Sequence, residues 1–301
     1  MTRRYKTMDG NEAAAHVSYA FTEVAAIYPI TPSSPMADFV DQWSAKGQKN
    51  IFGSTVKVQE MQAESGAAGA VHGSLNAGAL TTTYTASQGL LYMAEAVYNA
   101  SGLGLPIVMT VASRAIGAPI NIWNDHSDSM SQRDCGWIQL FAEDNQEAVD
   151  LHIQAFKIAE ELSLPVMVCM DGFVLTHAFE RMDIPSQEQV DQFLPPYDPR
   201  QSLDPEQPVS IGAMVFTEVR YLAHAHHLQA LGVIDRVAKE YEEIIGRKSG
   251  GLVDLYRAED AEVMVVALGS VIGTIKDVID EMREDGKKVG LLGIKSYRPF
   301  P

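Results

Sequence analysis

Cysteine is nearly absent from this sequence of 301 residues, which contains only Cys135 and Cys169. The two lie far apart in the chain, so the sequence has no CxxC pair or other close ligand spacing for zinc or for an iron–sulfur cluster. We predict that both are buried small hydrophobic residues, since Cys169 lies inside the apolar run 166–170. Any electron transfer must therefore take place outside this chain.

Positive charge is also scarce, with 23 Lys and Arg against 39 Asp and Glu and a formal net charge of -16. Such a chain repels phosphodiester backbones and anionic membrane surfaces, so we expect neither nucleic acid nor a membrane as its partner. No apolar run reaches the roughly 18 residues of a membrane-spanning helix. The basic start at 1–6 has no hydrophobic stretch after it, as a secretory signal would. We predict a cytoplasmic protein.

Apolar runs of strand length alternate with helical patterns through the first half of the chain. This alternation is typical of an α/β fold, a parallel sheet with helices on both faces. The predicted strands are 24–28, 55–58, 79–85, 107–112 and 165–170. The predicted helices are 11–22, 34–44, 64–76, 89–100 and 145–162.

A Pro-rich arm is predicted at 183–210, where six of the 14 prolines fall, and we expect no regular element there. Apolar residues then recur every three or four positions over 228–244, which predicts an amphipathic helix ending near Gly246. Its histidines, His224, His226 and His227, have no carboxylate or cysteine nearby to complete a metal site. We therefore predict no metal in this chain.

A strand at 262–268, a helix and a second strand at 289–294 predict a βαβ unit near the end of the chain. We predict a domain over 1–258 and the beginning of a second domain over 259–301, whose polypeptide we expect to continue. The turn GSVIGT at 269–274 could bind a phosphate, or its glycines could serve only tight strand-to-helix packing. No GxGxxG follows a strand, which disfavours a dinucleotide-binding enzyme.

Ligands of parallel sheets bind beyond the carboxyl ends of the strands, so the chemistry is sought in the loops that begin at Pro29, Gln59, Ala86 and Ser113. The first loop, YPITPSSP at 28–35, opens a helix with Ser33 or Ser34 as N-cap. Its backbone donors and the Thr31 hydroxyl could bind a small carboxylate. A rigid proline turn with an ordinary cap is the alternative.

Two charged side chains stand at further strand ends. Glu64 begins a helix of small residues, where the helix dipole favours an ionised carboxylate that can share a proton with a ring nitrogen. It could equally be an ordinary helix-starting glutamate, and Glu60 is a rival for the role. Arg114 follows the strand 107–112 and could clamp a substrate carboxylate, or pair with a surface acid. The role of the cluster Asp125, His126 and Asp128 stays open, because turn residues of these types are common.

Four segments together resemble the N-terminal, aminopyrimidine-side domain of the pyruvate:ferredoxin (flavodoxin) oxidoreductases, which are 2-oxoacid oxidoreductases dependent on thiamine diphosphate. They are MDGN at 8–11, YPITPSS at 28–34, EMQAESGA at 60–67 and TASQG at 85–89. The segments DCGW at 134–137 and FLPPY at 193–197 resemble the separate alpha subunits of multi-subunit members. The resemblance implies the thiamine-enzyme pyrimidine-domain fold, followed by the start of a transketolase C-terminal-like domain.

The resemblance also implies roles for individual residues. Glu64 and Pro29 would contact the cofactor, with Glu64 against N1′ of the aminopyrimidine, and Thr31, Arg114 and Ile30 would contact the 2-oxoacid. The family binds the diphosphate and its Mg²⁺ on a different domain and carries [4Fe-4S] clusters elsewhere in the complex. The implied partners are the other domains or subunits, ferredoxin or flavodoxin, pyruvate and coenzyme A, in an oligomer. This chain alone is expected to be inactive.

Two alternatives stay open. The first is the same chemistry on another 2-oxoacid, such as 2-oxoglutarate, a branched 2-oxoacid or oxalate, although the presence of Thr31 argues against oxalate. The second is a non-catalytic binding or assembly module with the same fold. Thr31, Glu64 and Arg114 at three separate strand ends argue against that module, because fold stability requires none of them.

Overall fold

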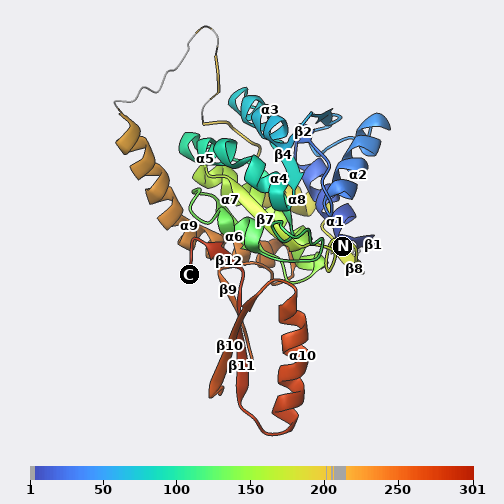
Figure 1. Cartoon of the computed structure of the whole chain (residues 1–301), viewed down its shortest axis with the longest axis vertical. Helices are drawn as coiled ribbons and strands as arrows, with labels where there is room; N and C mark the ends of the chain where they lie inside the picture. The colour runs from blue at the N-terminus through green and yellow to red at the C-terminus, as the bar shows by residue number, and fades with distance from the viewer. Residues whose placement is uncertain (1–3, 201, 205, 207–214) are drawn as a thin grey trace.

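The computed structural model describes residues 4–200, 202–204, 206 and 215–301 of the chain. Its central sheet consists of β2 (Val24–Ile27), β3 (Lys57–Glu60), β4 (Thr81–Thr85), β5 (Val108–Ser113), β6 (Ile138–Phe141), β7 (Val166–Asp171) and β12 (Ser296–Arg298). The strand order is β12-β6-β7-β5-β4-β2-β3. Figure 1 labels β2, β4, β7 and β12 of this sheet. Neighbouring strands run parallel except β12, which is antiparallel to β6.

Helices cover both faces of this sheet. One face packs against α1 (Gly10–Ala20), α2 (Ser34–Ala45), α7 (Asn145–Leu162), α8 (Gln187–Phe193) and α9 (Phe216–Ile245). The other packs against α3 (Glu64–Asn76), α4 (Ser87–Tyr92) and α5 (Ala94–Leu103). Strand β7 supplies Val168 and Met170 to the first core and Met167 and Cys169 to the second. A strand that is apolar on both sides is what a sheet covered on both faces requires, and the predicted α/β fold is confirmed.

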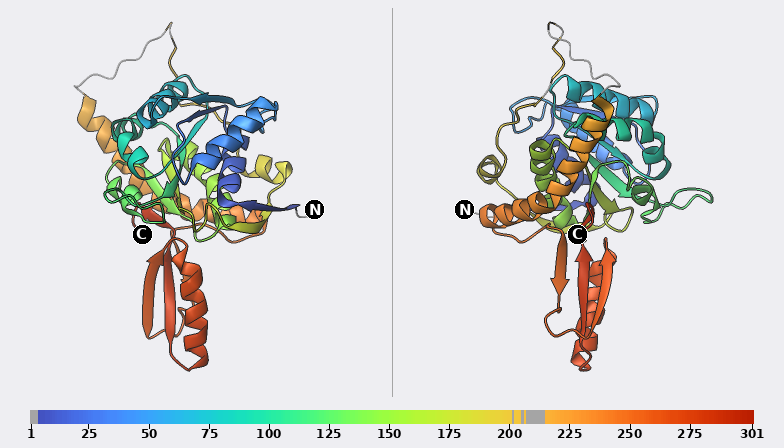
Figure 2. Two further views of the ribbon diagram at one scale, coloured as in Figure 1. Left: turned by 45° about the vertical axis from the view of Figure 1, so that its right-hand side comes forward. Right: turned by 90° about the vertical axis from the view of Figure 1, so that its left-hand side faces the viewer.

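A smaller unit projects from one end of this body in Figures 1 and 2. It is made of β9 (Val253–Tyr256), β10 (Val263–Leu268), α10 (Val271–Glu284) and β11 (Val289–Ile294). Strands β10 and β11 are parallel, as the predicted βαβ unit requires, and β9 is antiparallel to β11. The chain then returns through β12 to the central sheet. The division at 258/259 stays a prediction, with β9 in the small sheet and β12 in the large one.

Local sequence patterns placed several elements correctly. The helices predicted at 64–76 and 145–162 have the observed bounds of α3 and α7. The helix predicted at 89–100 is instead two, α4 and α5, which meet at Met93. The strand predicted at 55–58 lies two positions later, at Lys57–Glu60. The prediction missed several short elements, which are β1 (Arg4–Asp9), its antiparallel partner β8 (Phe179–Ile184), α6 (Ser127–Ser131), β6, β9 and β12.

The predicted Pro-rich arm was wrong for Gln187–Phe193, which form α8. Ser186 and Gln189 build a capping box there, and this local signal outweighs the prolines on either side. After α8 the chain reaches the end of α3, where the Leu203 amide donates to the Asn76 carbonyl at 2.6 Å. Residues 201, 205 and 207–210 of the arm lie outside the described residues.

The helix predicted at 228–244 is α9, which begins earlier, at Phe216, and ends at Gly246 in a left-handed C-cap with φ 79°. Its buried His227 has its Nε2 3.3 Å from the Trp137 carbonyl. Cys135 and Cys169 are free and buried, as predicted. Among the described helices, none combines the length and the apolar character needed to span a bilayer.

Candidate active site

The candidate site lies where the loops after β2, β4 and β5 and the start of α3 come together. These strands are neighbours in the parallel part of the sheet, so their carboxyl ends share one edge. The loop after β2 carries Thr31, and Gln88 lies in the first turn of α4, which follows β4. Arg114 follows β5, and Glu64 is the first residue of α3.

Arg114 joins two of these loops. Its Nη1 donates to the Thr31 carbonyl at 2.5 Å, and its Nη2 donates to the Gln88 Oε1 at 3.2 Å. The side chain is nearly buried, and its Nε has no hydrogen-bond partner among the described residues. Within that part of the chain Arg114 pairs with no acid, unlike an ordinary surface arginine. The structure therefore brings Thr31 and Arg114 together, as their strand ends predicted.

The loop after β2 is a tight turn. The Ser33 amide and hydroxyl both donate to the Ile30 carbonyl, each at 2.8 Å. Ser33 is the N-cap residue of α2, as predicted, but its hydroxyl does not cap the helix. The side chains of Pro29 and Thr31 are exposed and that of Ile30 is half-buried. These two hydrogen bonds hold the backbone of the turn that carries Thr31.

Glu64 lies against the first turn of α4. A Cβ added to Gly89 would lie 3.0 Å from the Glu64 Cγ and Oε1 and 2.6 Å from the Thr85 hydroxyl. The missing side chain of Gly89 is therefore what lets the Glu64 side chain rest there. Among the described residues, Glu64 forms no hydrogen bond or ion pair, and the buried Thr85 hydroxyl has no partner. The rival Glu60 is exposed at the end of β3.

A buried carboxylate, Asp128 of α6, lies beneath this arrangement. Its Oδ2 accepts the amides of Ser87 at 2.8 Å and of Arg114 at 3.0 Å, and its Oδ1 accepts the Ser129 amide at 2.6 Å. Burial raises the pKa of Asp128 to about 6, although these three hydrogen bonds oppose the shift. The three amide donors favour the ionised form, whereas burial favours the neutral one.

His126 belongs to a different contact, toward the small unit. Its Nε2 lies 2.6 Å from the Asp171 Oδ1, and the Asp171 Oδ2 accepts the Ser270 amide at 2.9 Å and hydroxyl at 2.5 Å. A Cβ on Gly269 would lie 3.1 Å from the Asp171 carboxylate. The GSVIGT turn was expected either to bind a phosphate or to serve tight packing. Tight packing is observed, because the Asp171 carboxylate accepts the Ser270 amide and hydroxyl that a phosphate would use.

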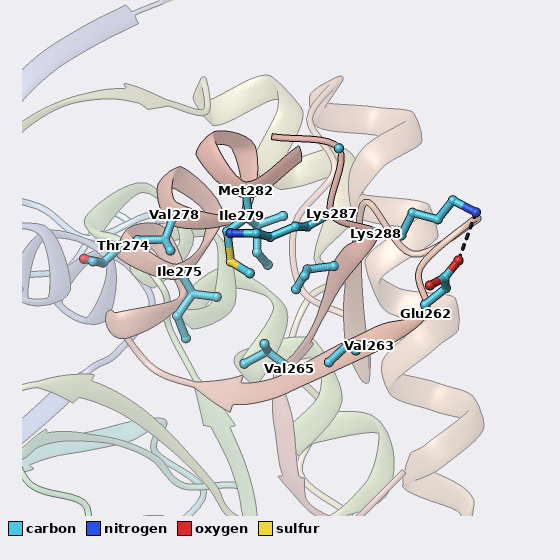
Figure 3. Close-up of a pocket in the computed structure, with 12 residues that line it drawn as sticks. Glu262, Val263, Val265, Thr274, Ile275, Val278, Ile279, Met282, Lys287 and Lys288 are labelled. Atoms are coloured by element: carbon cyan, nitrogen blue, oxygen red, sulfur yellow. Dashed lines mark hydrogen bonds and ion pairs between the residues drawn. The ribbon is translucent and has the colours of Figure 1, made fainter. Parts of the chain in front are cut away.

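A cavity of about 690 Å³ lies away from this site, between β10 and α10 of the small unit. Figure 3 shows its lining, which is mainly apolar, with Val265, Ile275 and Met282 pointing inward. Its charged residues include Glu262 and Lys288, which pair with each other at 3.0 Å at the edge. The polar groups suited to catalysis therefore lie at the strand ends of the central sheet rather than in this cavity.

Two models of known protein families match this chain. The family model described as "pyruvate flavodoxin/ferredoxin oxidoreductase, thiamine diP-binding" matches residues 16–243. The chain belongs to this family. A second family model, the core domain II of pyruvate:ferredoxin oxidoreductase, matches residues 261–301. The resemblance seen in the sequence is confirmed.

Curated members of the family match the whole chain. It is 45% identical to the pyruvate synthase subunit PorA of Methanosarcina barkeri, covering 99% of this chain and 75% of that subunit. It is 42% identical to the pyruvate-flavodoxin oxidoreductase of Klebsiella pneumoniae, covering 100% of this chain but 26% of that protein. The chain thus corresponds to most of a separate subunit and to about a quarter of a single-chain enzyme.

Two solved structures share the fold. A 2-oxoglutarate:ferredoxin oxidoreductase of Magnetococcus marinus has a TM-score of 0.74 at 19% identity, covering 99% of this chain and 55% of that chain. A transketolase of Pichia stipitis has a TM-score of 0.52 at 13% identity, covering 97% of this chain and 35% of that chain. At these identities the likeness establishes the fold alone.

Reasoning from strand ends found Thr31, Glu64 and Arg114, and their roles in the family's chemistry stay predictions. It left two residues of the same site without a role. In the sequence, Gln88 is recognisable only as part of the segment 85–89, and Asp128 only as a member of a polar cluster. The available signal was that both follow strands of the predicted sheet, but nothing local indicated their partners.

Proposed function

We propose that this chain supplies the half of a pyruvate:ferredoxin oxidoreductase active site that contacts the aminopyrimidine of thiamine diphosphate and the carboxylate of the 2-oxoacid. The reaction converts pyruvate and coenzyme A to acetyl-CoA and CO₂ and passes electrons to ferredoxin or flavodoxin. The observation that carries the proposal is the position of Glu64 and Arg114, which contact the adjacent residues Gly89 and Gln88 in the first turn of α4. Family membership and the names of the relatives favour pyruvate.

The residues present fit the aminopyrimidine side of this cofactor. Its recognition needs a carboxylate that has no competing protein cation, beside a surface that a ring can approach. Glu64 has no ion-pair partner among the described residues, Gly89 leaves the backbone bare, and the Thr85 hydroxyl is unpaired. When bound, thiamine diphosphate supplies the carbanion chemistry at the keto carbon.

The chain's own residues then have distinct tasks. Glu64 shares a proton with the pyrimidine ring nitrogen, and Pro29 borders the same ring. The Thr31 hydroxyl and the Arg114 guanidinium would bind the substrate carboxylate, and Ile30 would also contact the substrate. Two observations support this assignment: Thr31 is exposed, and the Arg114 guanidinium, which pairs with no acid among the described residues, donates to the Thr31 carbonyl.

The rest of the site belongs to other domains or subunits of an oligomeric complex. We propose that these bind the diphosphate with Mg²⁺, hold the [4Fe-4S] clusters and dock the electron acceptor. Burial raises the pKa of Cys135 to about 12 and that of Cys169 well above its usual range, in keeping with two thiols inside the apolar core. We place the complex in the cytoplasm, in line with the acidic charge of this chain.

The proposal is tested by anaerobic, coenzyme-A-dependent viologen reduction by the complete complex that contains this chain. Pyruvate, 2-oxoglutarate, 2-oxoisovalerate and oxalate are compared as substrates. We expect pyruvate to be turned over fastest. Glu64→Gln should lower kcat by about 10²-fold to 10⁴-fold, the usual contribution of a positioned proton-transfer group.

Glu60→Gln is the matched control, because Glu60 lies four residues away and is exposed at the end of β3. It should keep the parent turnover. Preference for another 2-oxoacid would change only the substrate. Absence of activity with all four substrates, in a complex with intact clusters, would refute the enzymatic function and favour the assembly module.

A further inference from the structure

Asp128 holds two loops of the proposed site by their backbones. Its Oδ2 accepts both the Ser87 amide, which follows β4, and the Arg114 amide, which follows β5, and the side chain is fully buried. These strands are neighbours in the sheet. A single oxygen therefore fixes the relative position of the two strand ends.

The two backbones carry the groups that face the proposed ligands. Ser87 has a left-handed φ of 51° and begins α4, and the next residue, Gln88, accepts from the Arg114 guanidinium at 3.2 Å. The hydrogen bonds thus form a closed ring, from Asp128 through Ser87 and Gln88 to the Arg114 side chain and back through its amide. Gly89, under Glu64, is the next residue along.

Fold stability alone does not account for a carboxylate here. A buried charge carries a large desolvation cost, and well-packed apolar residues are often as stable in its place. Burial raises the pKa of Asp128, which shows that this environment disfavours the ionised form. A carboxylate nevertheless suits three amide donors, since both oxygens only accept; an asparagine would turn an NH₂ group toward the Ser129 amide.

We propose that Asp128 is a positioning residue of the thiamine and 2-oxoacid site, which sets the place of Gln88 and of the Arg114 guanidinium by holding the Ser87 and Arg114 amides. The inference rests on the proposed function. It predicts that changing Asp128 weakens substrate binding more than it weakens the fold.

The test uses the complete complex with Asp128→Asn and Asp128→Glu. Asparagine keeps the size and removes the charge, whereas glutamate keeps the charge and displaces the oxygens by one methylene. We expect both variants to raise the KM for pyruvate about 10-fold or more, the factor that loss of about 1.4 kcal/mol of binding gives. Hydrogen–deuterium exchange should become faster in the peptides that contain the Ser87 and Arg114 amides.

Asp150→Asn is the matched control. Asp150 is an equally buried carboxylate, but it binds the Tyr241 hydroxyl at 2.7 Å and Arg247 at 2.6 Å, on α9 and just beyond it. It should lower the melting temperature and leave the KM and the exchange at Ser87 and Arg114 unchanged.

Parent KM and parent exchange in both Asp128 variants would overturn the proposal. Failure of both to assemble would also overturn it, because Asp128 would then serve the fold. If the parent complex turns over no 2-oxoacid, the proposed function fails. The exchange measurement still decides whether Asp128 holds the two loops.

Discussion

At the scale of single residues, Gly89 decides where the Glu64 carboxylate can lie. Gly89→Ala would place a methyl group 2.6 Å from the Thr85 hydroxyl and 3.0 Å from Glu64. Such overpacking costs about 1–3 kcal/mol, and the least constrained neighbour, Glu64, has to move. We expect turnover to fall by about 10²-fold or more, as in other cases of a displaced proton-transfer group.

Viologen reduction and the melting temperature of the complex check this prediction, with Gly69→Ala as the control. Gly69 lies inside α3 with no atom near its missing Cβ. Alanine there should be neutral or stabilise by up to about 1 kcal/mol, because it is the better helix former. Parent turnover in Gly89→Ala would mean that Glu64 is not held in place by this contact.

At the scale of elements, a capping box stabilises the first turn of α8. The Ser186 hydroxyl accepts the Gln189 amide, and the Gln189 side chain accepts the Ser186 amide. Ser186→Ala removes the first of these bonds and should cost about 1 kcal/mol, which corresponds to about 5-fold faster amide exchange in 187–193. Hydrogen–deuterium exchange measures this, with Ser65→Ala on the exposed face of α3 as the control. Unchanged exchange in Ser186→Ala would show that packing alone maintains α8.

At the scale of the whole molecule, ionic contacts join the small unit to the central body. The buried Lys295, just after β11, binds Glu147 at 2.6 Å and Glu143 at 2.9 Å. Lys295→Met leaves Glu147 buried without a cation, which should cost about 3–5 kcal/mol. Lys295→Met combined with Glu147→Met should recover most of this loss. Thermal unfolding of the complex reports both.

The control for the Lys295 contacts is Lys288→Met. Lys288 pairs with Glu262 at 3.0 Å, but both side chains are more than half exposed, at 51% and 73%. Removing such a pair should cost less than about 1 kcal/mol. Equal losses in Lys295→Met and Lys288→Met would mean that the buried pair contributes no more than a surface pair.

The His126–Asp171 pair lies within the central body, and Asp171 also binds Ser270 of the small unit. The strength of this pair depends on pH. Burial opposes both charges, but the hydrogen bond and the charge of the partner lower the pKa of Asp171 from 3.8 and raise that of His126 from 6.5. The contribution of His126 is full below pH 6.5 and is lost as pH rises through its folded value. The contribution of Asp171 is present above pH 3.8 and is lost as pH falls through its folded value. The His126–Asp171 contact is therefore strongest between pH 3.8 and pH 6.5.

His126→Asn should consequently lower the melting temperature most near about pH 5 and least near about pH 9. His126 also faces the acids Asp125 and Asp128, so the difference between parent and variant contains their attraction to the imidazolium together with the Asp171 contact. His224→Asn, at an exposed position of α9, serves as the control. A difference that does not vary with pH would contradict the assigned pair.

The sequence by itself determined the α/β class, the family, and the three strand ends with Thr31, Glu64 and Arg114, because hydrophobic periodicity, helix starts and motifs are local properties of the chain. Helices α3 and α7 follow from such signals. Only the tertiary structure decided that Asp128 holds Ser87, that Asp171 fills the turn at Ser270, and that β12 returns to the central sheet. These contacts depend on strand order and register, which bring distant segments together and which no local pattern encodes.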